Sequence, residues 1–157
     1  MKTLIMFAIK SVPLSVMSKY VWNEYCCIFS FMQRNGKKMK LKDVKADYIL
    51  LYLNDPECSA CQQTKEALLQ SDILAHWING GLMKIISICT EGRTEGWEKI
   101  STPEGWIDGC DEQKRLLKED LYDLRNLPAI YLLDANKVIL LKNATLFRLE
   151  QYLGKHR

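Results

Sequence analysis

Two cysteines separated by two residues, in Cys58-Ser59-Ala60-Cys61, are the side chains of this 157-residue chain whose type and spacing best suit chemistry. Thiols at this spacing interconvert between a dithiol and a disulfide, and they can also serve as a pair of metal ligands. A structural zinc site needs a second ligand pair, but no second Cys-x-x-Cys occurs, and His76 and His156 form no His-x-x-x-His pair. The motif therefore favours thiol redox chemistry over metal binding or an incidental pair of thiols.

The residues around the motif predict how it is held. An apolar run at residues 48–53 predicts a strand, Asn54-Asp55-Pro56 predicts the turn that ends it, and residues 62–70 predict a helix. Because Cys58 then meets the unpaired N–H groups and the positive dipole end of the helix, its thiolate should be stabilised. This order of elements is typical of a redox-active pair.

Composition limits the classes of protein to consider. The chain has 48% hydrophobic and 26% charged residues, which suits one globular domain with a sizeable core. The formal net charge of +3 is mild, and the lysines are dispersed apart from a group at residues 37–42, so we expect no nucleic-acid partner. No uncharged apolar run of ~18 residues occurs, so we expect no membrane-spanning segment.

The N-terminal residues differ from the rest of the chain. We divide the sequence into an appendage at residues 1–25 and one domain at residues 26–157. Met1-Lys2 followed by the apolar residues 3–9 has the character of a short signal sequence, although Lys10 interrupts it and no small-residue cleavage site follows. An amphipathic or buried helix that packs on the domain is the alternative.

Hydrophobic patterning predicts an α/β fold with a central mixed sheet flanked by helices and preceded by an N-terminal β-hairpin. The hairpin is expected from residues 28–32, the Asn35-Gly36 turn signal and residues 38–41. Continuous apolar runs at residues 48–53 and 83–89 predict strands buried on both faces. The remaining predicted elements are helices at 62–69, 73–78, 112–121 and 144–153, and strands at 129–133 and 138–141.

Residues 90–111 have no regular pattern and are predicted to form a glycine-rich insertion over the sheet. Trp97 and Trp106 within it either line a substrate groove or pin the insertion to the core. Asp111 is expected to cap the following helix. The residues expected to face inward from that helix are Leu116, Leu117 and Leu121.

The other four cysteines have simpler expected roles. Cys89 ends a buried strand and is expected to be an inert core thiol, whereas Cys110 lies in the irregular insertion, where it could be exposed. Cys26 and Cys27 precede the hairpin, and one of them could pair with Cys110.

Pro128 opens a predicted strand, a position where proline is tolerated because it need not donate a hydrogen bond to the sheet. One interpretation is the start of an edge strand. The other is a cis Leu127–Pro128 bond, which proteins retain where a tight and specific geometry is needed.

From about residue 29 to residue 153, the sequence resembles the thioredoxin fold, and specifically the TlpA-like thioredoxins of bacterial cell envelopes. It is similar in particular to thioredoxin-like C-terminal domains of envelope proteins of Gram-negative anaerobes. The residues that carry the resemblance are the strand leading into Cys58-Ser59-Ala60-Cys61, the stretch Leu124-Arg125-Asn126-Leu127-Pro128-Ala129-Ile130-Tyr131-Leu132-Leu133-Asp134, and the Asn136-Lys137 turn.

The resemblance implies a thiol-disulfide oxidoreductase that needs no organic cofactor and no metal. Cys58 would attack a disulfide, Cys61 would resolve the mixed disulfide, and Pro128 would be cis and face the two cysteines. The residues implied in substrate binding are Glu57, Ser59, Ala60 and Leu127. The implied partners are protein disulfides or dithiols and an upstream redox partner, and the implied location is the cell envelope or periplasm, with the cytoplasm as the alternative.

The chain departs from the family pattern at several positions. Most thioredoxins have tryptophan directly before the first cysteine, whereas this chain has Glu57, with Asp55 two residues earlier; these carboxylates should oppose thiolate formation. Where relatives keep a buried acid, this chain has Tyr52 or Thr64. Proton transfer is therefore expected to use water, Glu57 or Lys65.

Two alternatives belong to other functional classes. A copper or zinc carrier could use the same two thiolates, but it lacks a well-placed histidine, because His76 lies on an apolar stripe. A non-catalytic thioredoxin-like docking module of a larger envelope protein would suit the acidic residues near Cys58 and the unusual N-terminal segment.

Overall fold

Strand β3 (Tyr48–Asn54) is hydrogen-bonded to a neighbouring strand on each side. In the computed structural model, which describes residues 29–120 and 122–156, β3 runs parallel to β4 (Met83–Cys89) and antiparallel to β6 (Ala129–Asp134). Every residue of β3 between its two ends is buried, as is every residue of β6 before Asp134. This two-sided burial explains why both strands are continuous apolar runs, as the sequence predicts.

The described part of the chain forms a seven-stranded sheet in the order β2-β1-β5-β4-β3-β6-β7. The strands that join β3, β4 and β6 are β1 (Ser30–Met32), β2 (Lys38–Lys40), β5 (Ile107–Cys110) and β7 (Ile139–Leu141). Parallel pairing is confined to β3, β4 and β5, and the outer strands pair antiparallel. The sheet is therefore mixed, which confirms the predicted α/β class.

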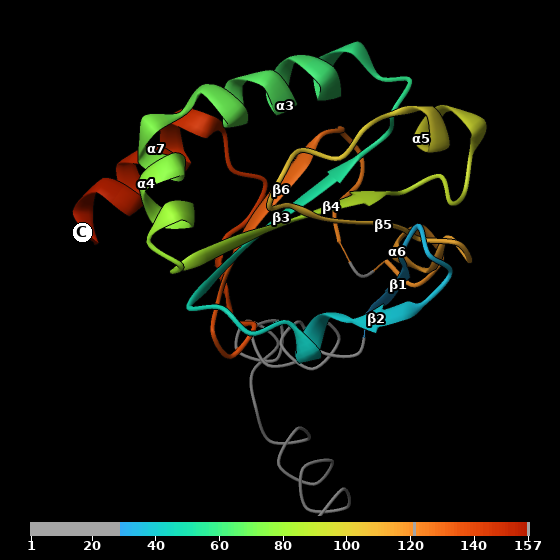
Figure 1. Ribbon diagram of the computed structural model, residues 1–157, viewed down its shortest axis with the longest axis horizontal. Helices are drawn as coiled ribbons and strands as arrows, with labels where there is room; N and C mark the ends of the chain where they lie inside the picture. Colours follow the sequence, from blue (N-terminus) through green and yellow to red (C-terminus); the bar gives the residue numbers. More distant parts are fainter. Residues whose placement is uncertain (1–28, 121, 157) are drawn as a thin grey trace, which may run out of the picture.

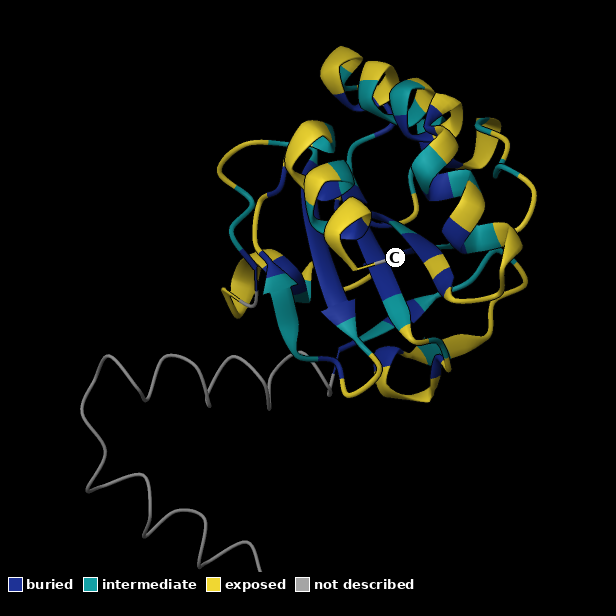
Figure 2. Ribbon diagram, turned by 90° about the vertical axis from the view of Figure 1, so that its left-hand side faces the viewer, coloured by how far each residue is buried: buried dark blue, intermediate teal, exposed yellow. Residues whose placement is uncertain are grey.

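Three helices cover one face of this sheet (Figures 1 and 2). They are α3 (Ser59–Gln70), α4 (Asp72–Asn79) and α7 (Leu146–Lys155). Their apolar side chains pack against Leu50 and Tyr52 of β3 in one core cluster. Ser71 joins them through its hydroxyl, which accepts a hydrogen bond from the first turn of α4 and donates one to Glu150 of α7 at 2.6 Å. The predicted helices of this layer are confirmed.

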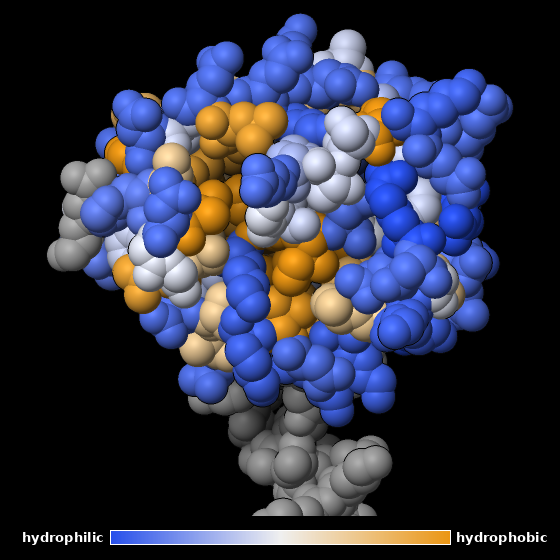
Figure 3. Space-filling view, viewed as in Figure 1, coloured by the Kyte–Doolittle hydropathy of each residue, from blue (hydrophilic) through white to orange (hydrophobic). Residues whose placement is uncertain are grey.

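The opposite face of the sheet is covered mainly by short elements and loops rather than by long helices. Leu51 and Leu53 of β3 pack there in a second core cluster with residues of β1, of a short 3₁₀ turn η1 (Leu41–Asp43) and of α6 (Arg115–Lys118). Tyr122 closes this layer with its ring edge-on to Tyr131 at 4.7 Å. Both faces are thus covered, but helices dominate only one of them. In the view of Figure 3, hydrophilic side chains surround apolar surface near the middle, where Figure 1 places the strands.

The predicted N-terminal hairpin is confirmed between β1 and β2. Ser30 is paired with Lys40 and Met32 with Lys38. The turn between the strands needs a left-handed residue, and Gly36 supplies it with φ of +80°. A second predicted turn, at residues 134–137, joins β6 to β7, where the Asp134 carboxylate accepts hydrogen bonds from two backbone N–H groups of the turn.

The prediction of an irregular insertion at residues 90–111 is wrong at its end. Residues Ile107–Cys110 form β5, which pairs parallel to β4 and antiparallel to β1. A short helix, α5 (Glu95–Lys99), precedes it, with the Thr94 side chain as its N-cap. Strand pairing overrides the weak local signal of Ile-Asp-Gly-Cys, because the backbone groups of β5 find partners on both sides.

The helix predicted at residues 112–121 is only one turn long. α6 begins after Lys114, which has φ of 53°, and Leu116 is buried while the side chain of Leu117 is 65% exposed. Asp111 does serve this turn, because its carboxylate accepts a hydrogen bond from the Leu116 N–H at 2.8 Å. Leu121, the appendage predicted at residues 1–25, and Cys26 and Cys27 lie outside the described residues, so the predicted domain division stays a prediction.

Two glycines form a matched test of the packing between β1 and β5. A Cβ at Gly109 would overlap the ring of Phe31 and lie 2.9 Å from the carbonyl oxygen of Met32, whereas a Cβ at Gly154 of α7 would meet no atom within 4 Å. We expect Gly109→Ala to lower the free energy of unfolding by about 1–3 kcal/mol. Gly154→Ala should raise it by roughly 0.5–1 kcal/mol, because alanine favours the helix.

Urea denaturation of the two variants and the parent measures both changes. Equal or greater stability of Gly109→Ala would contradict the tight contact between the two strands.

Candidate active site

Cys58 lies at the junction between the turn that follows β3 and the first turn of α3. Its sulfur is the N-cap of α3 and accepts a hydrogen bond from the Cys61 N–H at 3.3 Å. The turn is fixed by Asp55, whose carbonyl oxygen accepts from the Cys58 N–H at 3.1 Å and whose carboxylate accepts from the Glu57 N–H at 2.9 Å. The Cys58 sulfur is thus partly exposed at a helix N-terminus, where it satisfies one backbone N–H group of the first turn.

Leu127 and Pro128 lie directly beside this sulfur. The peptide bond between them is cis, as one of the two interpretations of the sequence predicts. The Cys58 sulfur lies 3.9 Å from the carbonyl oxygen of Leu127, and Pro128 immediately precedes β6. The approach follows from the antiparallel pairing in which Leu53 of β3 is opposite Ala129 of β6.

Cys61 lies beneath Cys58 and is only 2% exposed. Burial, together with the hydrogen bond to Cys58, raises the pKa of its thiol to about 12. The hydroxyl of Tyr52 donates a hydrogen bond to the backbone carbonyl of Cys61 at 2.5 Å, which ties the first turn of α3 to β3. Burial raises the pKa of the Tyr52 phenol strongly, so this group keeps its proton.

A small polar cavity of about 30 Å³ lies next to Cys61 and Tyr52. Its wall includes the side chains of Arg34, Lys65 and Asp108, which come from three separate elements or loops. A space of this size holds one or two water molecules where polar partners are present. The cavity therefore gives the buried thiol a polar neighbour that the sequence motif does not reveal.

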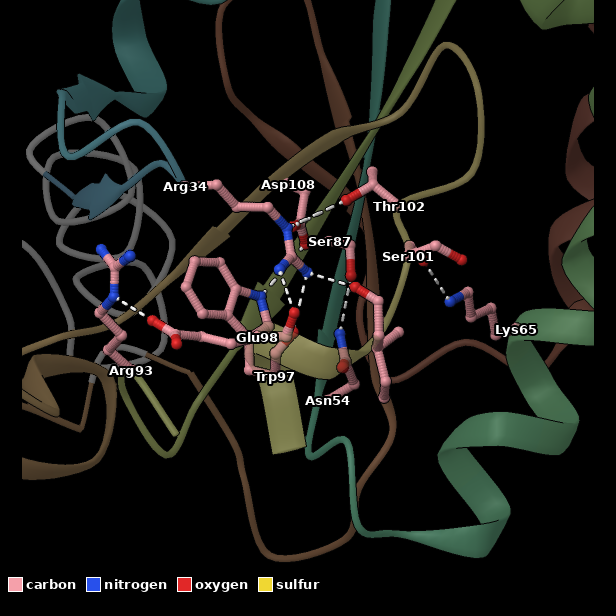
Figure 4. Close-up of polar contacts among 11 residues, drawn as sticks. Arg34, Asn54, Lys65, Ser87, Arg93, Trp97, Glu98, Ser101, Thr102 and Asp108 are labelled. Carbon is pink, nitrogen blue, oxygen red and sulfur yellow. Dashed lines mark hydrogen bonds and ion pairs between the residues drawn. The ribbon is translucent and has the colours of Figure 1, made fainter. Parts of the chain in front are cut away.

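Arg34, in the turn between β1 and β2, contacts α5, the residues that follow α5, and β5 (Figure 4). Its guanidinium forms an ion pair with Asp108 of β5 at 2.5 Å and donates to the carbonyl oxygens of Trp97 and Ile100 at 2.9 and 2.8 Å. It also lies 4.3 Å from the centre of a Trp97 ring. These contacts hold α5 and the residues after it against the sheet beside the two cysteines.

Comparison with solved structures finds several proteins with a similar fold. The C-terminal domain of an uncharacterized protein from Bacteroides fragilis has 36% sequence identity and a TM-score of 0.77 over 80% of this chain and 91% of that one. A thioredoxin-like protein from Bacteroides caccae has 32% identity and a TM-score of 0.79, over 91% of this chain but only 53% of that one. This chain belongs to the thioredoxin-like superfamily.

The predicted TlpA-like resemblance is thereby confirmed. A third domain, from Cytophaga hutchinsonii and described as that of a possible thiol-disulfide isomerase, has 27% identity and a TM-score of 0.67 over 82% of this chain and 87% of that one. No protein-family model and no curated protein sequence matches the chain.

In this thioredoxin-like domain, the residues predicted for the site lie in two groups. Cys58, Cys61, Leu127 and Pro128 are brought together, as the preceding distances show. Ser59 and Ala60 are exposed at the start of α3, on the solvent side of the motif. Glu57 is exposed and faces α5, because an added Cβ at Gly96 would lie 3.5 Å from its carboxylate.

Sequence reasoning missed most of the polar residues near Cys61. Arg34 lies next to the predicted Asn35-Gly36 turn and Asp108 lies in the predicted insertion at residues 90–111, so neither is predicted for the site. Ser87, which is opposite Tyr52 in the parallel pairing, accepts a hydrogen bond from the Asn54 side chain at 3.0 Å. The one signal in the sequence is Ser87, a polar residue within the apolar strand predicted at residues 83–89, because Asn54 is predicted to lie in the turn after the other strand.

Cys89 and Cys110 form a separate buried group with Trp97. Cys89 is buried as predicted, but Cys110 is fully buried rather than exposed, because β5 places it between β4 and β1. Burial raises the pKa of both thiols to about 11. A bond from Cys110 to Cys26 or Cys27 would involve residues outside the described part, whereas the four cysteines at positions 58, 61, 89 and 110 are free thiols.

The two tryptophans of residues 90–111 differ in position. Trp97 is 3% exposed and pins α5 to the sheet, which is one of the two predicted roles. Trp106 is half-buried, with a ring edge-on to Tyr52 at 6.1 Å, so it lies near the buried side of the motif. His76 is exposed on α4, whereas the sequence predicts it on an apolar stripe.

Residues 29–120 and 122–156 contain neither a candidate metal centre nor a membrane-spanning helix. No three His, Cys, Asp or Glu side chains in these ranges are grouped so that they could hold a metal ion. None of the helices in these ranges is long and apolar enough to cross a membrane.

The three buried thiols predict how stability depends on pH in the reduced protein. The pKa values of Cys61, Cys89 and Cys110 are raised to about 11–12 by burial, whereas an unfolded thiol has a pKa of about 8.5. The unfolded chain therefore loses protons first, and the stabilisation present below pH ~8.5 is lost as the pH rises towards 11. The expected loss is up to ~1.4 kcal/mol per thiol and pH unit.

Urea unfolding at pH 8 and 9.5, with a phosphine reductant, measures this dependence. Cys89→Ala should reduce the difference between the two pH values, whatever its effect on stability at pH 8. An equal difference in the variant would show that the Cys89 thiol ionises as readily in the folded state as in the unfolded one.

Proposed function

We propose that this thioredoxin-like domain is a thiol-disulfide oxidoreductase that acts on protein disulfides or dithiols. The observation that carries the proposal is the position of the Cys58 sulfur, which caps α3, is partly exposed and lies 3.9 Å from the Leu127 carbonyl, above the buried Cys61. An accessible nucleophilic sulfur with a second thiol one helical turn away is the arrangement that thiol-disulfide exchange requires.

In the reducing direction, the proposed reaction has two steps, attack by Cys58 and resolution by Cys61. The Cys58 thiolate attacks one sulfur of the substrate disulfide, a bond forms between them, and the other substrate sulfur leaves as a thiolate that takes a proton. Cys61 then loses its proton and attacks the Cys58 sulfur, which forms the Cys58–Cys61 disulfide and releases the second substrate sulfur. The oxidising direction is the exact reverse of these steps.

Leu127 and Pro128 are proposed to receive the substrate backbone. Extended peptides bind through main-chain hydrogen bonds to exposed backbone groups, and the Leu127 carbonyl next to Cys58 offers such a group. Glu57, Ser59 and Ala60 are exposed and adjoin the two cysteines in the sequence, and they are proposed to contact the substrate.

An upstream redox partner, a dithiol in the reducing direction, is part of this proposal, because the Cys58–Cys61 disulfide must be reduced again after each cycle. The location in the cell envelope or periplasm stays a prediction that rests on the sequence resemblance.

Trapping of the mixed disulfide tests the function. In the Cys61→Ser variant, Cys58 should still attack the insulin disulfide. The mixed disulfide between Cys58 and insulin should then accumulate, because the second thiol that would resolve it is missing. The parent should turn over with dithiothreitol, and Cys58→Ser should neither turn over nor form an adduct. Insulin precipitation and intact-protein mass spectrometry measure the two results.

Cys89→Ser is the matched control, because its thiol is buried away from solvent and is not part of the proposed reaction. A Cys58→Ser variant with the parent's rate of insulin reduction would exclude Cys58 as the nucleophile. Absence of any adduct on Cys61→Ser would argue for a docking module instead of an enzyme.

A further inference from the structure

The resolving step requires that Cys61 lose a proton inside the protein. Its thiol is 2% exposed, and its pKa is raised to about 12 by burial and by the hydrogen bond to Cys58. At neutral pH it is therefore a thiol, and a neighbouring group must accept its proton before it can attack.

Tyr52 and Ser87, which lie beneath α3, and the exposed Glu57 are poorly suited to accept this proton. Tyr52 lies under α3, but its phenol already donates to the Cys61 carbonyl, and its raised pKa keeps it protonated. Ser87, opposite Tyr52 on β4, is a neutral hydroxyl bound to the Asn54 side chain. Glu57 is exposed and faces α5 rather than the cavity beside Cys61.

The side chain of Lys65 brings an amine to the cavity beside Cys61. Lys65 follows Cys61 by four residues on α3, so the two side chains leave the same face of the helix one turn apart. Both line the cavity of about 30 Å³, which has room for one or two waters. The Lys65 ammonium donates to the Ser101 carbonyl at 3.1 Å, which holds the side chain at the cavity (Figure 4).

Other charged groups at the cavity are occupied by partners. The Asp108 carboxylate binds Arg34 at 2.5 Å and accepts from the Thr102 hydroxyl at 2.9 Å. The Arg34 guanidinium is bound to that carboxylate and to the carbonyl oxygens of Trp97 and Ile100. Asp55 uses its carboxylate to accept the Glu57 N–H in the turn before Cys58. The charged and titratable side chains that line the cavity with Lys65 are Arg34, Tyr52, Asp55, Cys61 and Asp108.

We propose that Lys65 accepts the proton of Cys61 through this cavity when Cys61 resolves the mixed disulfide. The proton passes from the Cys61 sulfur, by way of a water molecule, to the neutral Lys65 amine. The Cys61 thiolate attacks the Cys58 sulfur, the bond between Cys58 and the substrate breaks, and the substrate thiolate leaves and takes a proton from solvent. The inference rests on the proposed oxidoreductase function and adds a residue to it.

The electrostatic surroundings of Lys65 agree with this role. Partial burial and the nearby Arg34 lower its pKa, and Asp108 opposes that change. A lowered pKa increases the fraction of neutral amine near physiological pH, and a general base works best when its pKa is near the working pH.

The two sulfur steps can be separated with Ellman's reagent. The chain with Cys26→Ser and Cys27→Ser is reduced and mixed with the reagent in a stopped-flow instrument. Attack by Cys58 releases the first thionitrobenzoate, and resolution by Cys61 releases the second. Cys61→Ser in the same background identifies the phases, because only the first release remains.

We expect Lys65→Met to slow the second release on the order of 10²-fold at pH 7.5, while the first release changes little. The rate of the second release in the parent should rise with pH as Lys65 becomes neutral, and Lys65→Met should remove this rise. Lys65→Arg should be as slow as Lys65→Met, because a guanidinium keeps the charge but cannot accept a proton. Circular dichroism and urea midpoints establish that each variant is folded.

Lys99→Met is the matched control. Lys99 is an exposed lysine of α5, and it lies next to the cavity-lining Ile100 without lining the cavity itself. Its substitution should leave both phases unchanged.

Two results would overturn the inference alone: an unchanged second phase in Lys65→Met, or a normal second phase in Lys65→Arg. If Asp55→Asn is slow in the second phase while Lys65→Met is not, Asp55 takes the role instead of Lys65. Loss of the first phase in the parent would overturn the proposed function, and the inference with it.

Discussion

The antiparallel pairing of β3 with β6 is the constraint on which the site depends. In such a pair, the end of one strand lies opposite the beginning of the other, and here Leu53 is opposite Ala129. The turn after β3 and the residues before β6 must therefore meet at one edge of the sheet. This explains why the Cys58 sulfur reaches the carbonyl of Leu127, 69 residues later in the sequence. Burial of β3 on both faces fixes this register, because a shift by one residue would exchange the side chains of the two core layers.

The elements that could be predicted from sequence are those whose signal is local. β3 and α3 have a long apolar run or a helical pattern, and the hairpin turn has Asn35-Gly36. β5 has no such signal, because Ile-Asp-Gly-Cys contains a charge and a glycine. Its aspartate is stabilised by Arg34, 74 residues away, and its glycine is required because the ring of Phe31 occupies the space of a side chain. Both causes are contacts that exist only in the folded chain.

The candidate site likewise contains residues with a recognisable sequence pattern and residues without one. The Cys-x-x-Cys motif and Pro128 carry a recognisable pattern, so their meeting could be expected. Arg34 carries none, since its partners include the backbone carbonyls of Trp97 and Ile100, which every residue possesses. The cavity beside Cys61 likewise combines side chains from a hairpin turn, from helices α3 and α5, and from strands β3, β4 and β5. Long-range polar contacts of this kind leave no periodicity in the sequence.

The distribution of charge around Cys61 follows from the cost of burying an ion. An ionised carboxylate beneath α3 would need a partner and further hydrogen bonds to offset its desolvation. This chain has the neutral pair Tyr52 and Ser87 at that depth, and Tyr52 uses its hydroxyl to fix the backbone of Cys61. The charged groups lie at the cavity wall instead, where Arg34 and Asp108 satisfy each other. With neutral side chains beneath Cys61 and charged ones at the cavity wall, the proposed path of the Cys61 proton runs along α3 to Lys65 rather than down into the sheet. In this proposal, the direction of proton transfer follows from which layer of the fold can hold a charge.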